Sequence, residues 1–291
     1  MHPFTLPLLL ALILSPTLLS AAELEAIPNC RLIETDWADG DSFLIRTPDE
    51  KELSIRLYGV DCLEWHVSDE TDARRLRAQR RYFGITTVED SAAASIQVAK
   101  AFGELAWEEV RRVLGEPFTV YTAYADARGD SNYRRIYAFV VLSDGTQLAE
   151  HLVRQGLARA FGVTRSMPDG RSREAFEAHL ADVELLAAKT GVGIWARTDW
   201  GSLENERMTQ RLEDEELSLA TAKPALREGE TLDPNSASSD NLMKLPGVGP
   251  VLAKRMIEGR PYTSVEDLRR VSGIGAETLA QIRPYLNISE E

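Results

Sequence analysis

Three short segments of alternating hydrophobic residues place the strongest constraint on the fold. They read RLIETDW, SFLIRT and ELSIRLYGV, and they span residues 31–37, 42–47 and 52–60. An Asp-Gly turn separates the first two segments and a Pro-Asp turn the last two, as is typical of connections between antiparallel strands. Two more segments, 118–124 and 135–142, have the same character. The sequence therefore predicts five strands.

Three segments with helical spacing of apolar residues accompany these strands. The first spans about 92–114, between the third and fourth strands, and the others span 148–160 and 173–190, the last ended by Gly191. Apolar residues three or four positions apart predict helices with one buried face. This order is typical of the OB-fold, a small five-stranded barrel. We therefore predict an α+β fold, with a five-stranded OB-fold β-barrel and three helices, over residues 23–197.

The first 22 residues differ from the rest of the chain. They carry no Asp, Glu, Lys or Arg, contain an apolar block from Leu6 to Leu14, and end in small residues. This pattern predicts a secretory signal peptide cleaved after Ala22. The alternative is a membrane anchor, but the apolar block is short for a bilayer span and Pro16 interrupts it. We expect a secreted or periplasmic protein without membrane attachment after cleavage.

The chain is acidic, with a formal net charge of −13, which taken alone disfavours binding to phosphate backbones. The charge is unevenly distributed. Residues 198–240 hold 11 acidic and 4 basic side chains and lack apolar periodicity, whereas residues 241–288 hold 7 basic and 4 acidic ones. We predict an acidic flexible linker over 198–238 and a small all-α domain over 239–288.

Cysteine and histidine usage limits the metal chemistry. Two cysteines, Cys30 and Cys62, and four scattered histidines form no zinc-type cluster, so a metal would need oxygen ligands. Cys30 precedes Asp41 by 11 residues. An extended strand would then place Cys30 near the opposite end of the barrel from Cys62, and we expect no disulfide between them.

Two acidic clusters follow strands of the predicted barrel. Asp39 and Asp41 lie in the turn after the first strand, and Asp61 and Glu64 follow the third. Alternate strands of a meander run in the same direction, so both clusters should lie at one end of the barrel. Converging carboxylates require a compensating cation, and oxygen ligands suit Ca²⁺ or Mg²⁺.

Arginines accompany the acidic clusters. Arg56 lies five residues before Asp61, and Arg134 and Arg135 precede the fifth strand. Guanidinium groups beside a metal–carboxylate site suit a phosphate group. Each feature alone is as readily explained by a turn or a surface ion pair, and it is their joint placement that favours a site.

Together these motifs resemble the staphylococcal nuclease family, from Asp39 to Trp195. The resemblance rests on Asp39-Gly40-Asp41-Ser42, on Arg56, Asp61 and Glu64 at the family spacing, on Tyr133-Arg134-Arg135, and on LAEHLVRQGLARAF and GVGIW. It implies hydrolysis of DNA, and also of RNA, to products with 3′-phosphates, with Ca²⁺ as the cofactor.

The resemblance also implies a set of metal ligands. Asp41 and Asp61 would bind Ca²⁺ through their carboxylates, and Cys62 through its backbone carbonyl. Asp39 would not bind the cation itself but would help to orient these ligands. So few protein ligands predict weak binding, on the order of 10⁻⁴–10⁻³ M.

Three further residues receive catalytic roles from the resemblance. Glu64 would orient or deprotonate the attacking water. Arg56 and Arg135 would bind the scissile phosphate and stabilise the charge that builds up during attack.

The chain departs from the family pattern in three places. Cys62-Leu63 stands where the family usually has Thr-Pro or Ala-Pro, Ser42 replaces a threonine, and residues 65–91 resemble an insertion. The insertion either holds the substrate backbone near the site or forms a solvated helix face. Its arginines are Arg74, Arg75, Arg77, Arg80 and Arg81.

Two similar elements fill the C-terminal segment: LPGVGPVLAKRM at 245–256 and VSGIGAETLAQI at 271–282. Each has a Gly-x-Gly turn followed by a helix, and together they resemble the paired helix-hairpin-helix motifs of competence-type DNA receptors. The glycines would let backbone N–H groups approach a phosphate. Alternatively, the hairpins only pack together or bind a protein. The residues predicted to contact DNA are Gly247, Gly249, Lys254, Arg255, Gly273 and Gly275.

The leading interpretation is an exported, Ca²⁺-dependent nuclease that its C-terminal domain tethers to DNA. The main alternative is a non-catalytic nucleic-acid-binding or uptake protein that uses the barrel as a scaffold. The retained acidic residues disfavour it, and they also disfavour a protein-interaction module.

Overall fold

The computed structural model describes residues 23–87, 91–127, 134–221, 226–227 and 229–288, so the predicted signal peptide lies outside the described residues. The chain divides into two compact units, Met1–Gln210 and Arg211–Glu291. Within the described ranges, no helix combines the length and apolar character needed to cross a membrane.

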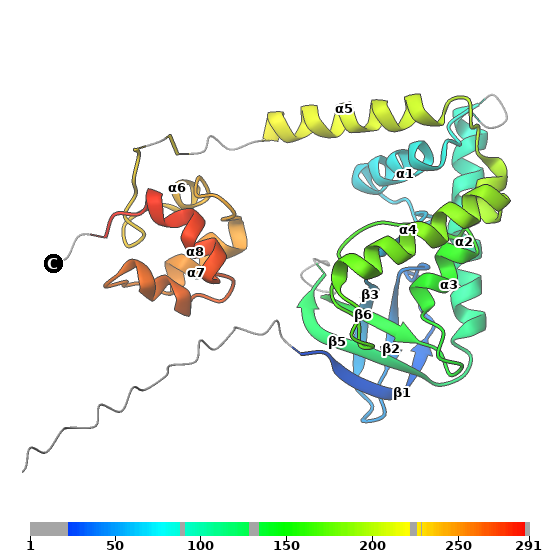
Figure 1. Ribbon diagram of the computed structural model, residues 1–291, viewed down its shortest axis with the longest axis horizontal. Coiled ribbons are helices and arrows are strands. Elements are labelled where there is room, and N and C mark those ends of the chain that lie inside the picture. Colours follow the sequence, from blue (N-terminus) through cyan, green and yellow to red (C-terminus); the bar gives the residue numbers. More distant parts are fainter. Residues whose placement is uncertain (1–22, 88–90, 128–133, 222–225, 228, 289–291) are drawn as a thin grey trace, which may run out of the picture. The chain divides into compact units, whose positions relative to one another are not determined.

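A closed barrel with the strand order β1-β2-β3-β6-β5 forms the centre of the first unit (Figure 1). Strands β1 to β3 are an antiparallel meander, β3 pairs in parallel with β6, and β5 closes the barrel against β1. The predicted OB-fold barrel is confirmed. The strands are β1 Glu25–Ile33, β2 Ser42–Arg46, β3 Glu52–Leu57, β5 Phe118–Asp126 and β6 Arg135–Val141.

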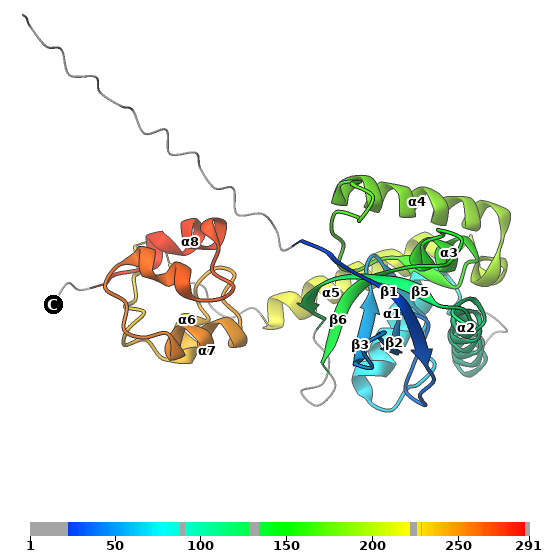
Figure 2. The ribbon, with the colours of Figure 1, turned by 90° about the horizontal axis from the view of Figure 1, so that it is seen from below.

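Helices pack around the barrel, and α3 and α4 lie side by side (Figures 1 and 2). Buried residues of α2, α3 and α4 join the barrel interior in one core that contains Phe43, Phe139 and Phe176. The bounds are α1 Glu70–Phe83, α2 Ala92–Val113, α3 Leu148–Arg154 and α4 Arg173–Thr190, with a 3-10 helix at Gly193–Arg197.

Helix α1 occupies the predicted insertion and adds to the three expected helices. The Asp69 side chain caps its first turn by accepting hydrogen bonds from the N–H groups of Thr71 and Asp72, and Gly84 ends it in the left-handed conformation. The helix is not a purely solvated surface element, because Leu76, Gln79, Arg80 and Phe83 are buried.

Three predicted elements end earlier than their sequence patterns indicate. The first strand, predicted over 31–37, spans Glu25–Ile33. The third strand stops at Leu57, since Gly59 adopts φ +79°, and a separate strand β4, Val60–Cys62, follows. The helix predicted over 148–160 stops at Arg154, because Gly156 adopts φ +63°. Strand β7, Ala158–Ala160, then pairs with β4 in a small antiparallel sheet.

The segment predicted as a flexible linker, residues 198–238, contains helix α5, Leu203–Thr221. Part of this helix is anchored to α1, because Arg207 donates to the Tyr82 carbonyl and Arg81 donates to the Gln210 side chain. Its run of Glu, Leu, Arg and Met also favours helix formation. The acidic residues therefore mark a charged helix, and the prediction of a structureless segment is wrong there.

The second unit is a small helical domain, as predicted. Its core joins both Gly-x-Gly elements and also includes Ala237, so its packing begins before residue 239. The helices are α6 Ser239–Leu242, α7 Pro250–Glu258 and α8 Ala276–Ile282, with 3-10 helices at Val265–Arg270 and Arg283–Tyr285.

Candidate active site

The turn between β1 and β2 is held by its own acidic side chain. Asp39 Oδ1 accepts hydrogen bonds from the N–H groups of Asp41 and Ser42, at 3.0 and 2.7 Å. This arrangement orders the turn and places the buried Asp41 carboxylate beside β4, where its Oδ2 accepts the Cys62 N–H at 3.0 Å. Burial, together with the charges of Asp41 and Glu64, raises the pKa of Asp39 well above its ordinary value.

Arg56 bridges the two acidic clusters. Its Nη2 lies 3.2 Å from Asp41 Oδ2 and 3.0 Å from Asp61 Oδ1. Burial tends to raise the pKa of Asp41, but the Arg56 charge and hydrogen bonds from Ser42 and Cys62 outweigh it and hold that pKa below its ordinary value. Asp41 and Asp61 therefore converge at one end of the barrel, as predicted.

Asp61 receives two further donors that the sequence did not indicate. Its Oδ2 accepts hydrogen bonds from Gln79 Nε2 at 2.9 Å and from Arg159 Nε at 2.8 Å. Gln79 comes from α1 and Arg159 from β7. Asp61 is thus held by three donors from separate elements.

Glu64 lies beside this group and is only 8% exposed. Its Oε1 lies 2.6 Å from Arg75 Nη1, and its N–H donates to Gln79 Oε1 at 2.9 Å. Burial raises the pKa of Glu64, while the Arg75 charge opposes the rise. A buried carboxylate with a raised pKa is suited to general-base work.

Arg135 reaches the site from the start of β6. Its Nη1 donates to Ser42 Oγ at 3.1 Å, and Arg56 Nη1 lies 3.5 Å from the same oxygen. The two guanidinium groups thus flank one hydroxyl next to Asp41. Arg134 is exposed, and Tyr133 lies outside the described residues.

Three more residues belong to this group: Arg75, Gln79 and Arg159. The arginine-rich stretch before the second helix did point to Arg75 as one of five candidates. No sequence pattern points to Gln79 or Arg159. The contact of Gln79 depends on which face of α1 packs inward, and Arg159 lies on β7, in a segment whose apolar spacing predicts a helix.

The oxygen donors at this position are compatible with a hard cation such as Ca²⁺. Asp41 and Asp61 supply carboxylates, and Cys62 supplies a carbonyl that accepts a hydrogen bond from Gln79 Nε2. Arg56 Nη2 contacts both carboxylates, so a cation between them would have to displace it. Among the described residues, no group of three His, Cys, Asp or Glu side chains could hold a metal. Two carboxylates and one carbonyl are few protein ligands for Ca²⁺.

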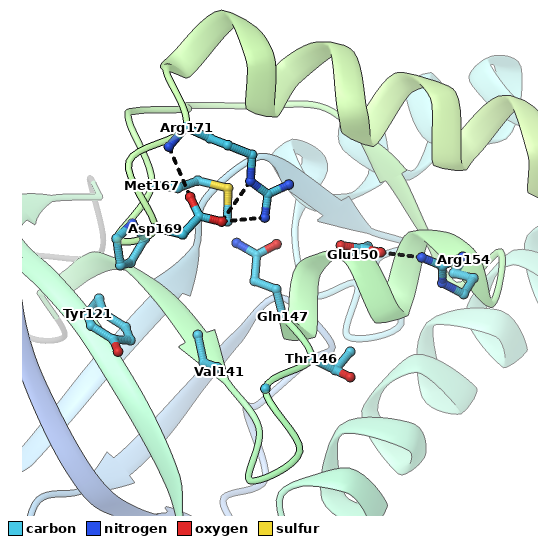
Figure 3. A pocket seen from close by; sticks show the side chains of 11 residues that line it. Tyr121, Val141, Thr146, Gln147, Glu150, Arg154, Met167, Asp169 and Arg171 are labelled. Carbon is cyan, nitrogen blue, oxygen red and sulfur yellow. Dashed lines mark hydrogen bonds and ion pairs between the residues drawn. The ribbon is translucent and has the colours of Figure 1, made fainter.

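A separate cavity of about 410 Å³ lies between β5, α3 and the loop before α4 (Figure 3). Tyr121, Gln147, Glu150 and Arg171 are among its lining residues, and none of the acidic residues described above contributes to it. The convergent charged groups, and not this cavity, mark the candidate active site.

In the second unit the two Gly-x-Gly turns share one geometry. Gly247 and Gly273 adopt φ +73° and +105°, and Gly249 and Gly275 are the N-terminal caps of α7 and α8. Backbone N–H groups at the start of α7 are therefore presented as a phosphate site requires.

The predicted basic residues of this unit differ in their surroundings. Lys254 is 77% exposed and lies 3.8 Å from Glu258, so it is available to a ligand. Arg255 Nη1 instead donates to the Ser272 carbonyl at 3.0 Å. Arg255 thus ties the first hairpin to the second.

Comparison with known proteins gives short matches to curated relatives. The chain is 39% identical over 62 residues to a "Deoxyribonuclease" of Thioalkalivibrio sp., covering 21% of this chain and 17% of that protein. It is 39% identical over 66 residues to "Endonuclease/exonuclease/phosphatase family domain-containing protein 1" of Mus musculus, covering 21% of this chain and 12% of that protein. These matches span less than a fifth of each relative.

A third relative has a different name: "Photosystem II extrinsic protein U" of a Picosynechococcus strain is 40% identical over 58 residues, covering 20% of this chain and 42% of that protein. Family comparison matches residues 54–197 to "Staphylococcal nuclease homologue" and residues 227–287 to "Helix-hairpin-helix motif". The chain therefore carries a domain of the staphylococcal nuclease homologue family, followed by a helix-hairpin-helix motif.

Proposed function

We propose that this chain is a Ca²⁺-dependent nuclease that hydrolyses phosphodiester bonds of DNA and RNA. One observation carries the proposal: three buried acids, Asp41, Asp61 and Glu64, converge with the half-buried Arg56 guanidinium at one end of the barrel. Nucleic-acid binding alone has no need of buried acids beside a phosphate, since each repels it.

In this reaction Glu64 accepts a proton from the attacking water as the new bond between water oxygen and phosphorus forms. The bond between phosphorus and the 5′ oxygen breaks, which leaves a 3′-phosphate on one product and a 5′-hydroxyl on the other. Arg56 and Arg135 donate hydrogen bonds to the phosphoryl oxygens as charge builds up. To do so, Arg56 gives up part of its contact with the acids.

Asp41, Asp61 and the Cys62 carbonyl are the groups that would hold Ca²⁺. Bound there, the cation supplies Lewis-acid polarisation of the phosphate and orients it. Burial, and after it the charges of Asp41 and Glu64, raise the pKa of Asp39. The charges of these neighbouring carboxylates favour a cation at this position.

We further propose that the helix-hairpin-helix unit tethers the enzyme to DNA and that the protein is exported. Tethering is supported by the paired Gly-x-Gly turns and the exposed Lys254. Export is supported by the apolar N-terminal sequence alone.

The test is cleavage of plasmid DNA by the mature protein with Ca²⁺, Mg²⁺ or EDTA. We expect Ca²⁺-dependent cleavage that Glu64→Gln and Arg135→Ala each reduce by at least ~100-fold. Glu174→Gln is the matched control, because Glu174 is an exposed carboxylate on α4. Activity that survives EDTA, or both active-site substitutions, contradicts the proposal.

A further inference from the structure

The Gln79 side chain makes three hydrogen bonds with the segment Asp61–Glu64, although Gln79 itself has no catalytic role in the proposed reaction. Its side-chain nitrogen donates to Asp61 Oδ2 at 2.9 Å and to the Cys62 carbonyl at 2.7 Å, and its side-chain oxygen accepts the Glu64 N–H at 2.9 Å. One amide thus contacts three of the four residues in the segment.

The three contacts also fix the orientation of the amide. Both partners of Nε2 are acceptors and the partner of Oε1 is a donor, so exchanging the two atoms would break every bond. Gln79 has no exposed surface, which means that water cannot replace a lost partner cheaply. The amide is therefore specific to this segment.

Leu63, the remaining residue of the segment, is held by apolar packing. It is 1% exposed and belongs to a buried cluster that includes Leu76 and Phe83 of α1. On its other side α2 approaches closely, because a Cβ on Gly103 would lie 2.3 Å from the Leu63 carbonyl oxygen. Side chains of α1 thus hold both side chains and backbone groups of the segment, and α2 packs against its other side.

We propose that Gln79 is a positioning residue, which sets the Asp61 carboxylate, the Cys62 carbonyl and the Glu64 backbone in the geometry that catalysis and cation binding require. The inference rests on the proposed function for its catalytic part. Helix α1 then contributes to the active site indirectly, because the Gln79 side chain positions the functional groups and contacts neither substrate nor cation. Groups that hold metal ligands in place typically contribute 10–100-fold to metal affinity or activity.

Gln79→Met in the full chain keeps the shape of the side chain and removes all three hydrogen bonds. Arg80→Met is the matched control, because Arg80 is also buried on α1 but donates to Ser95 Oγ, on α2, at 2.8 Å. Both variants remove hydrogen bonds from the same helix, but only Gln79→Met affects the segment.

We expect Gln79→Met to lower kcat for plasmid cleavage by about 10–100-fold with little change in KM. It should weaken Ca²⁺ binding, measured by calorimetry, by about 10-fold or more, and speed hydrogen exchange at the Glu64 amide. Arg80→Met should leave kcat and Ca²⁺ affinity near wild type at temperatures where it is folded. Equal kcat and Ca²⁺ affinity in the two variants would overturn the proposal.

Two further outcomes are also decisive. If Gln79→Met does not fold, Gln79→Asn replaces it, because the shorter amide cannot reach all three partners. Wild-type activity in that variant overturns the proposal, and a loss of at least ~10-fold supports it. If the wild type itself cleaves no DNA, the proposed function fails, while exchange at the Glu64 amide in metal-free protein still decides whether Gln79 holds the segment.

Discussion

Gly40 shows how tightly the acidic turn is fitted to the strand that carries Asp61. A Cβ at this position would lie 2.7 Å from Cys62 Sγ and 2.8 Å from Ala106 Cβ. The Cys62 side chain therefore has a packing role beside Gly40, in addition to the backbone role assigned to its carbonyl. Both cysteines have free thiols.

Gly40→Ala should destabilise the fold by about 1–3 kcal/mol, because the added methyl group overpacks this contact. Urea denaturation measures the change. The double variant Gly40→Ala with Cys62→Ala should recover part of the loss relative to the sum of the single variants, since Sγ is the nearest atom. Strict additivity of the two changes would show that Cys62 is not the obstacle.

The pH dependence of cleavage should report the ionisation of Glu64. A general base must be ionised, so the rate falls as pH drops through its pKa, which burial raises above the ordinary value of a glutamate. The Arg75 charge opposes that rise, so Arg75→Gln should move the acid limb of kcat/KM to higher pH. Arg74→Gln is the control, since Arg74 pairs with Glu70. An unmoved limb in Arg75→Gln would argue against Glu64 as the base.

At the scale of elements, the sequence predicts the barrel better than it predicts the site. Alternation and turn dipeptides are local signals, and they give the strands that bring Asp41 and Asp61 together. The contact between Gln79 and Asp61 joins residues 18 apart, and that between Arg159 and Asp61 joins residues 98 apart. Neither depends on a local pattern, so neither could be predicted from the sequence.

The error at β7 has a local cause that the sequence did show. Gly156 interrupts LAEHLVRQGLARA, but a single glycine in an apolar periodic segment is also tolerated in helices. The structure explains the glycine, because a Cβ there would lie 2.2 Å from the Val192 carbonyl oxygen. The left-handed conformation of Gly156 ends α3, and β7 then brings Arg159 to Asp61.

Gly156→Ala should therefore lower the free energy of unfolding for two reasons: alanine is strained in the left-handed conformation, and its Cβ overlaps the Val192 carbonyl oxygen. Gly145→Ala is the matched control, because Gly145 adopts φ +86° with nothing within 4 Å of an added Cβ. We expect about 1–2 kcal/mol in the control and roughly 2 kcal/mol more in Gly156→Ala from the overlap. Equal losses in chemical denaturation would mean that the close contact relaxes freely.

At the scale of the whole molecule, acidic composition and nucleic-acid binding are compatible because the charges are segregated. The net charge of −13 includes an acidic run on α5, whereas Arg56 and Arg135 lie within the candidate active site and Lys254 lies on the helix-hairpin-helix unit. The net charge determines the long-range repulsion between protein and nucleic acid. A contact with a phosphate depends instead on the charged groups next to it.

The proposed tether predicts different kinetics on long and short substrates. Lys254→Glu should raise KM for plasmid DNA several-fold, with kcat unchanged, because a weaker tether lowers the effective DNA concentration at the nuclease domain. Cleavage of a short single-stranded oligonucleotide, which offers no duplex for the helix-hairpin-helix unit to bind, should not change. Arg283→Glu gives the same charge reversal at a residue that is paired with Glu266, and it should leave the cleavage of both substrates unchanged.

Salt gives a second test of the tether. Because phosphate contacts release counterions, the increase in KM for plasmid DNA in Lys254→Glu should become smaller as the salt concentration is raised. A Lys254→Glu variant that cleaves both substrates like the wild type at low salt would show that this unit does not deliver DNA to the barrel.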